Sequence, residues 1–280
     1  MNSKSPADFE RFEQRLQSEL MTHPVITDNQ YCKWFAEADL SMDDVRFFTQ
    51  QFSVFSNLFL VAQLYKTINA VDLEEMHAAK EILANEIGCI FNRRVEESAE
   101  SKQRRLENPD DEGDVELVNT EGTVDGGTFR FKAAHFEWLL NFAKPLGLGF
   151  ENMGKRKFGS DSTLFFCDEL IRIYGSDDFS ESAGASFAVE NWAAAGFWKQ
   201  LIEGLRRFKA NYVPELKLGF FTWHDKVEDQ HKAHTYEELK QLFFGPHAFE
   251  EDRFVQSGYE MLDGVAAFWN GLNQERLQRN

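Results

Sequence analysis

The sequence predicts an all-α protein, a helical bundle folded as one domain. Its long segments repeat apolar residues with the period of a helix rather than that of a strand. Proline is scarce, with 6 residues in a chain of 280, so helices can run for many turns without a break. No convincing alternation of apolar and polar residues, the pattern that indicates strands, is found. These observations favour helices packed around a sizeable core.

The N-terminal half is expected to contain three helices. The first spans about residues 6–21 and ends before Pro24, because the residue that precedes a proline disfavours helical geometry. Ser41 is a predicted N-cap with acidic residues after it, as the first turn of a helix prefers. The following run, 45–68, is apolar nearly all round, which is typical of a central, buried helix. A third helix is predicted over 72–94, with an aspartate as its cap.

The segment that follows, residues 95–127, is polar and acidic and ends in two adjacent glycines. This composition is typical of an inserted, mobile loop. Helices are predicted to resume after it, at about 129–146, 163–173, 183–209, 221–243 and 249–277. The expected organisation is therefore a single helical domain, 1–280, with an acidic insertion at about 95–127.

The composition argues against several classes of function. The formal net charge of −17, from 47 acidic and 30 basic residues, repels phosphate, so no nucleic-acid partner is expected. No apolar run reaches the roughly 20 residues that span a bilayer, and the polar N-terminus lacks a secretion signal, so no membrane partner is expected. The odd number of scattered cysteines, Cys32, Cys89 and Cys167, suits reduced thiols in a cytoplasmic protein better than disulfides.

Two histidines and a glutamate form the sharpest local motif. His224, Glu228 and His231 fall within about 60° of one another on a helix, since each residue turns the chain by about 100°. Two imidazoles and one carboxylate on a narrow stripe suit iron, manganese or zinc. The alternative is a solvated helix face, because Lys226 and Asp229 lie close by. The motif alone leaves both interpretations open.

Three further residues could complete a metal site. Glu86 interrupts an otherwise apolar helix face, and a buried carboxylate usually has a metal or an arginine as its partner. Glu190 precedes small residues that would leave room for a ligand, although an acid near the start of a helix is also favoured by the helix dipole. His135 lies on an apolar face, where a hydrogen-bonded core histidine is the more common interpretation.

In chain order these residues read Glu86, His135, Glu190 and His224-x3-Glu228-x2-His231. This order resembles the haem-oxygenase-like diiron oxidases, a superfamily that includes the chlamydial death-domain-associating protein and shares its fold with TenA/PqqC-like proteins. In that family a Glu, a His, a second Glu and a His-x3-Asp/Glu-x2-His motif come from different core helices. The resemblance implies a haem-oxygenase-like bundle whose iron ligands are Glu86, His135, Glu190, His224, Glu228 and His231.

The chain departs from the family pattern in two respects. The family usually places the first Glu and the following His within a few helical turns, whereas the acidic insertion separates Glu86 from His135 here. Some members add a carboxylate from the first core helix, where this chain has only apolar residues at 58–61. A site made of the residues named above, without a further carboxylate, is therefore expected.

The resemblance also implies a chemistry. Two iron ions, or iron with manganese, would use dioxygen as co-substrate to oxidise a small organic substrate, by N-oxygenation, oxidative C–C cleavage or a related reaction. Trp192, Phe197 and Trp223 are expected to line the substrate pocket, and core packing would explain these aromatic residues equally well. A homodimer is compatible with this fold.

Three other functions stay open. A ferritin-like diiron carboxylate protein would use the pairs Glu74-x-x-His77 and Glu228-x-x-His231, but His77 is predicted to lie on a polar, solvated face. A metal-free TenA/PqqC-like enzyme of the hydrolase kind would need a reactive cysteine, for which Cys167 is the candidate. A non-enzymatic interaction protein would use the acidic insertion to bind its partner.

Overall fold

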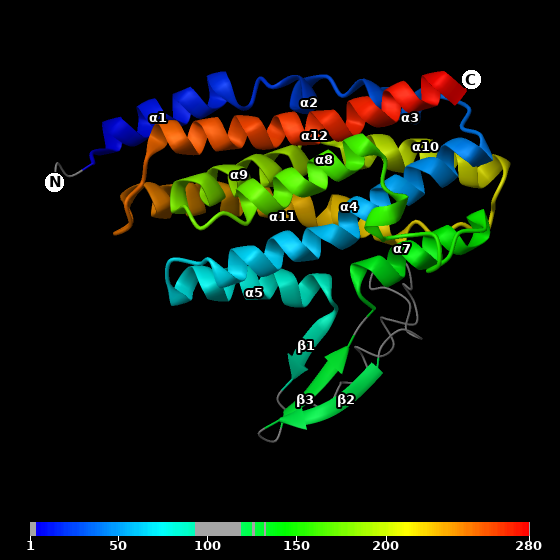
Figure 1. Cartoon of the computed structure of the whole chain (residues 1–280), viewed down its shortest axis with the longest axis horizontal. Helices are drawn as coiled ribbons and strands as arrows, with labels where there is room; N and C mark the ends of the chain where they lie inside the picture. Colours follow the sequence, from blue (N-terminus) through cyan, green and yellow to red (C-terminus); the bar gives the residue numbers. More distant parts are fainter. Residues whose placement is uncertain (1–3, 93–118, 125–126, 132, 280) are drawn as a thin grey trace.

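The computed structural model describes residues 4–92, 119–124, 127–131 and 133–279 of the chain, without the side chains of 90–131 and 227–238. Helices make up most of this part (Figure 1). The longer ones are α1 (Pro6–Glu19), α3 (Gln30–Glu37), α4 (Met42–Ile68), α5 (Leu73–Glu86), α7 (His135–Ala143), α8 (Asp161–Glu169), α9 (Phe179–Ala193), α10 (Phe197–Asn211), α11 (Gly219–Phe244) and α12 (Glu251–Arg279). Short helical segments are α2 (Pro24–Thr27), η2 (Lys144–Leu146), η3 (Arg156–Phe158) and η4 (Leu170–Tyr174). The all-α fold class is confirmed, and none of the described helices is both long and apolar enough to cross a membrane.

Polar caps fix where several of the helices begin. The Ser41 hydroxyl accepts a hydrogen bond from the Asp44 backbone N–H, and the Asp44 carboxylate accepts one from the Ser41 backbone. Asp72 caps α5 by accepting a hydrogen bond from the Glu75 backbone N–H. Each cap satisfies backbone donors that have no partner within the helix. Both predicted caps are confirmed.

The central helix of the body is α4, as its apolar sequence predicts. It packs against α5, α7 and α8. Its first half is enclosed on several sides, with Val45, Phe48, Phe52 and Val54 all buried. Its last turns are less enclosed, because Ile68 is 71% exposed. Burial therefore decreases along α4, and the continuous apolar run at 58–61 is only partly buried.

The last helix, α12, forms the other side of the core. It packs against α9, α8 and α3, and α8, α9 and α12 run beside one another in Figure 1. α9 and α12 lie very near each other at Gly184, where a Cβ atom would collide with the Phe254 carbonyl oxygen and the Ser257 hydroxyl. Only glycine allows the two helix backbones to lie this close together.

A three-stranded antiparallel sheet interrupts the helices, and the prediction of a chain without strands was wrong in this respect. The strand order is β1-β3-β2, where the strands are β1 (Cys89–Asn92), β2 (Asn119–Val124) and β3 (Gly127–Phe131). Figure 1 shows the sheet projecting from the helical body beside α5 and α7. Short apolar runs do not reveal by periodicity alone whether they are strand or helix. β1 pairs with β3 across the insertion, whereas only two residues separate β2 from β3.

The sheet corrects three predicted boundaries. The helix predicted over 72–94 ends at Glu86, and β1 follows it. The helix predicted from residue 129 begins at His135, since β3 occupies the residues before it. Part of the loop predicted at 95–127 is β2, and the remainder of that loop lies mostly outside the described residues.

The helix predicted over 183–209 is two helices. α9 ends at Ala193, and α10 begins at Phe197 after Gly196. Gly196 has φ +92°, in the left-handed region that favours glycine. The break turns the chain, so that aromatic residues on either side of it, Trp192 and Phe197, stack on each other.

Candidate functional site

One cavity, of about 120 Å³, lies between α4, α5, α7, α9, α10 and α11. Four of the residues expected to bind metal, Glu86, His135, Glu190 and His224, line it. Each comes from a different helix, so the fold brings together two carboxylates and two imidazoles that are distant in the sequence. The other lining residues are Phe52, Phe55, Ser56, Phe59, Asn85, Val189, Trp192, Ala193, Phe197, Trp198, Phe220 and Trp223.

The sheet explains how Glu86 and His135 meet despite the insertion between them. Glu86 is the last residue of α5, and His135 is the first residue of α7. Strands β1 and β3 pair so that Cys89 lies opposite Phe131, which closes the insertion at its base. The Glu137 carboxylate accepts a hydrogen bond of 2.6 Å from the Ala134 backbone N–H, and this cap fixes the first turn of α7.

The contact between these two side chains is short but is not a hydrogen bond. Nδ1 of His135 lies 2.9 Å from Oε2 of Glu86, and the side chains are 6% and 17% exposed. The two groups are not aligned as donor and acceptor, so the buried Nδ1 has no hydrogen-bond partner among the described atoms. A buried polar atom without a partner is rare and calls for an explanation.

A hydrogen bond at His224 fixes which ring nitrogen carries the proton. Nδ1 of His224 lies 2.6 Å from the Phe220 carbonyl oxygen, one turn earlier on α11. A carbonyl only accepts, so Nδ1 donates, and in the neutral ring the lone pair is on Nε2. This arrangement, with one ring nitrogen donating to a backbone carbonyl, is typical of metal-binding histidines. The rings of His224 and His135 have centroids 4.8 Å apart.

The negative charges of Glu86 and Glu190 act on a buried tyrosine, Tyr174. Tyr174 is fully buried, and the Gln63 side-chain amide donates a 2.6 Å hydrogen bond to its hydroxyl. Burial raises the pKa of Tyr174 well above its usual value, and the negative charges of Glu190 and Glu86 raise it further. Tyr174 therefore stays protonated and polar close to the acidic side of the cavity. The sequence offered one signal for this pair, a glutamine within the apolar run of α4.

The remaining two predicted ligands cannot be placed. Glu228 and His231 belong to α11, which continues without a break from Gly219 to Phe244, but their side chains lie outside the described residues. Among the side chains that are described, no three His, Cys, Asp or Glu come together closely enough to hold one metal ion. The assignment of all these residues as ligands therefore stays a prediction.

The donors that line the cavity nevertheless fit a metal ion. Carboxylate oxygen and imidazole nitrogen suit divalent iron, manganese and zinc. Two ligands at neighbouring positions of an octahedral ion, with bonds of about 2.1 Å, lie roughly 3 Å apart, which is close to the 2.9 Å between Glu86 and His135. Glu74 and His77, which a ferritin-like site would use, do not contribute donors to the cavity, because both are exposed.

Aromatic side chains form most of the rest of the lining. Trp192, Phe197 and Trp223, the residues expected to line a substrate pocket, all line this cavity, and their role in binding stays a prediction. Sequence reasoning missed the other aromatic residues. The spacing of three of them along α4 was the available signal, since it puts them on one helix face. The missed residues are Phe52, Phe55, Phe59, Trp198 and Phe220.

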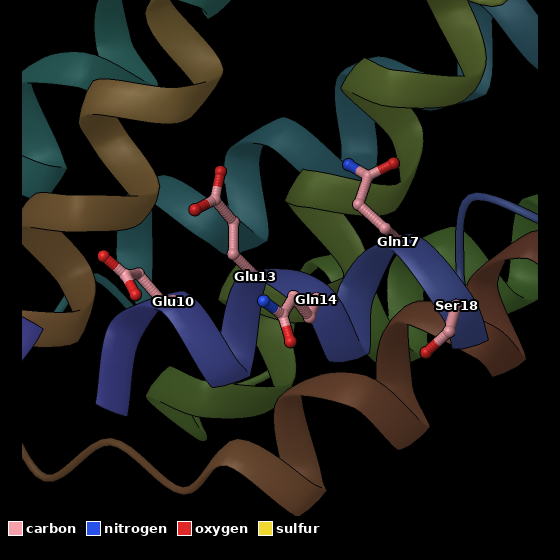
Figure 2. Close-up of a pocket in the computed structure, with 5 residues that line it drawn as sticks. All are labelled: Glu10, Glu13, Gln14, Gln17 and Ser18. Carbon is pink, nitrogen blue, oxygen red and sulfur yellow. The ribbon is translucent and has the colours of Figure 1, made fainter. Parts of the chain in front are cut away.

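A second hollow lies on the outer surface of α1. It is more open, with a volume of about 550 Å³. Figure 2 shows that its five polar side chains all come from this one helix. They are Glu10, Glu13, Gln14, Gln17 and Ser18. The described residues that line it include no imidazole, thiol or aromatic ring, so it lacks the metal-binding and aromatic groups of the 120 Å³ cavity.

Comparisons with known proteins establish the fold. No protein-family model and no curated protein matches the sequence. A TenA homologue from Pseudomonas syringae has a TM-score of 0.61 at 11% identity, over 94% of this chain and 93% of that chain. A CADD-like protein of unknown function from Nostoc punctiforme has a TM-score of 0.60 at 15% identity, over 98% of both chains. A domain of unknown function with a heme oxygenase-like fold from Shewanella denitrificans has a TM-score of 0.58 at 14% identity, over 98% and 95%. Identities this low show the fold alone.

Proposed function

Since the chain has a haem-oxygenase-like fold, we propose that it is a non-haem diiron oxidase that uses dioxygen to oxidise a small organic molecule. The fold includes enzymes, and the cavity at its centre carries donors that suit iron. The metal ions would be held by Glu86, His135, Glu190 and His224, together with Glu228 and His231.

The observation that carries the proposal is the pair of Glu86 and His135. Their facing atoms lie 2.9 Å apart without forming a hydrogen bond, and among the described atoms the buried imidazole nitrogen has no hydrogen-bond partner. Leaving a buried polar group unpaired costs about 1–3 kcal/mol, and burying an ionised carboxylate costs more. A metal ion between these two groups would offset both losses.

The protein's own groups would orient and enclose the reaction. Bound ferrous iron would supply electrons to dioxygen. The Phe220 carbonyl holds the His224 ring in one tautomer, and the buried Trp198 and Phe220 rings pack against that ring at centroid distances of 4.8 and 4.3 Å. These aromatic contacts exclude water from that side of the site and keep the ring from rotating.

The proposal predicts dioxygen consumption that depends on bound iron. The protein is loaded with ferrous iron in the absence of oxygen and is then freed of excess iron. When oxygen is admitted, it should consume dioxygen faster than the same amount of iron in buffer. Protein loaded with zinc is the matched control, because zinc occupies similar ligands but has no redox chemistry. An oxygen electrode measures both. Iron-loaded protein that consumes dioxygen no faster than free iron would contradict the proposal.

A metal-free enzyme of the TenA kind is the second candidate, favoured by the fold shared with the TenA homologue. A hydrolase of this kind needs a cysteine beside the cavity. Among the described residues that line the cavity there is no cysteine. Burial raises the pKa of the Cys167 thiol to about 12, and a protonated thiol is a weak nucleophile. This candidate is therefore less well supported.

Cysteine reactivity distinguishes the two candidates. In the folded protein at about pH 8, iodoacetamide should label Cys89, which is partly exposed, well before Cys32 and Cys167, which are buried. The reason is that burial both shields these two thiols and raises their pKa. Mass spectrometry of peptides taken over time measures the order. If Cys167 is labelled first, the hydrolase candidate gains support.

A further inference from the structure

One serine hydroxyl of α4, that of Ser56, has no hydrogen bond among the described atoms. The other serine and threonine hydroxyls of this helix donate to carbonyl oxygens of the preceding turn, as in the 2.6 Å bond from Thr49 to Val45. Its asparagine and glutamine side chains bond to other segments, as in the 2.6 Å bond from Gln63 to Tyr174. Ser56 is the exception, although a helix offers every hydroxyl such a carbonyl.

Ser56 lines the cavity within a row of aromatic residues. The other residues of α4 that line it are Phe52, Phe55 and Phe59. All four fall within about 100° of one another around the helix axis, since each residue turns the chain by about 100°. The Ser56 hydroxyl is therefore the one polar group on an aromatic helix face. A hydrogen bond is strong in such apolar surroundings, and a polar group that lacks one there is unfavourable.

The other uncharged amide or hydroxyl group of the described lining belongs to Asn85, at the opening of the cavity. Among the described residues that line the cavity, only Asn85 is exposed, so water can satisfy its amide. Ser56 is partly buried and lies deeper, between the aromatic rings. A ligand oxygen that replaces water at Ser56 keeps the hydrogen bond, whereas an apolar group in the same place loses it. Ser56 can therefore distinguish ligands by their polar group.

Two indole N–H groups favour a hydrogen-bond acceptor in the ligand. Nε1 of Trp192 and Nε1 of Trp198 are buried without a partner among the described atoms, and both residues line the cavity. An indole N–H only donates, so it can pair with an oxygen atom. Trp269, which does not line the cavity, has the same unpaired group, so the indoles are a weaker sign of a ligand than the Ser56 hydroxyl.

The volume of the cavity limits the ligand to a small molecule. Its volume is about 120 Å³, whereas a dry protein cavity of about 150 Å³ is known to hold benzene. The apolar body of the ligand therefore has about the size of one ring, and metal ions would take part of the same space.

We propose that Ser56 binds the substrate of this site, and that this substrate is a small uncharged molecule with a hydroxyl or carbonyl oxygen. The Ser56 hydroxyl donates a hydrogen bond to that oxygen, and Phe52, Phe55 and Phe59 contact the apolar body. The oxidation of the bound molecule rests on the proposed diiron function, whereas its binding depends only on the cavity.

Two probes that differ by one hydroxyl group test this inference. Benzyl alcohol carries the hydroxyl and toluene lacks it, and their apolar bodies are alike. Binding to the purified protein is followed by tryptophan fluorescence, since Trp192, Trp198 and Trp223 line the cavity. Ser56→Ala should weaken the binding of benzyl alcohol about fivefold, which corresponds to about 1 kcal/mol for one hydrogen bond, and leave the binding of toluene unchanged. Alanine favours a helix more than serine does, so this variant should stay folded.

Matched variants show whether the probes occupy this cavity. Thr67→Ala also removes a hydroxyl from α4, but that hydroxyl donates to the Gln63 carbonyl and Thr67 does not line the cavity, so the binding of both probes should be unchanged. Ala193→Leu should block both probes because it fills the cavity, whereas Ala195→Leu, at an exposed position nearby, should not. The proposal is overturned if Ser56→Ala weakens both probes equally or neither, if Ala193→Leu leaves binding unchanged, or if the wild type binds neither probe.

The result is separable from the fate of the proposed function. Metal content is measured in the same samples, so failure of the diiron proposal would appear as absent metal together with benzyl alcohol binding that still depends on Ser56. Failure of the present proposal would appear as bound metal together with binding that does not depend on the Ser56 hydroxyl.

Discussion

Replacing His224 by alanine is expected to weaken metal binding at least about 100-fold. Loss of a group that merely supports a metal-binding histidine already weakens binding by about 10–100-fold, and this change removes the predicted ligand itself. The Nδ1 hydrogen bond to the Phe220 carbonyl fixes the ring so that Nε2 carries the lone pair. The measurement is metal content after anaerobic loading with ferrous iron and removal of excess iron.

His77→Ala is the matched control for this prediction. His77 is exposed on α5, the helix that also carries Glu86, so its loss should leave the metal content unchanged. His135→Ala should behave like His224→Ala, because its Nδ1 lies beside the Glu86 carboxylate. If His77→Ala empties the site and His135→Ala leaves it full, a ferritin-like arrangement is the correct one.

Gly184→Ala is expected to reduce the free energy of unfolding by about 3 kcal/mol or more, at the upper end of the range for overpacking. The added methyl group would meet the Phe254 carbonyl oxygen and the Ser257 hydroxyl on α12. A backbone carbonyl cannot rotate away as a side chain can, so α9 and α12 must separate. The midpoint of thermal unfolding, measured by circular dichroism, should fall by roughly 5–10 °C.

Gly264→Ala, on α12, is the control for that prediction. The nearest atoms to its new methyl group are Glu169 Cβ and the terminal methyl carbon of Met261, both at 3.3 Å. The Met261 methyl can rotate away, and Glu169 Cβ has to move by only a few tenths of an ångström. Alanine also favours a helix over glycine by up to about 1 kcal/mol. Its stability should therefore stay within about 1 kcal/mol of the wild type. Equal losses in both variants would mean that the contact of α9 with α12 is not the cause.

Local patterns were sufficient to predict the helices but not their interruptions. The apolar run of α4 and its Ser41 cap predict a central helix, and the structure has one at Met42–Ile68. The strand β1 was missed because Cys89–Asn92 reads as a continuation of the apolar pattern of α5. Its partner, β3, lies beyond the insertion, and no local signal reveals a pairing over such a distance. The break at Gly196 depends on a left-handed backbone conformation that the small residues around it did not indicate.

In the candidate site too, residues marked by a local pattern could be predicted, whereas contacts that depend on the packing of distant segments could not. Glu86 could be found because a carboxylate on an apolar helix face requires a partner. His135 is placed beside it by the sheet, and only the resemblance to a family had suggested that the two belong together. Of the aromatic residues that line the cavity, Trp192, Phe197 and Trp223 were predicted to do so. Phe52, Phe55 and Trp198 were not, because the convergence of α4, α9 and α10 depends on how these helices pack.

The measurement that tests the central claim most directly is an anaerobic titration of the purified protein with ferrous iron, followed by equilibrium dialysis and iron analysis. The proposed site predicts saturation at about two irons per chain, as a two-metal centre requires, and a sharp loss of this binding in His224→Ala. Folded protein that retains no iron under these conditions would contradict the claim and leave the cavity to a metal-free chemistry.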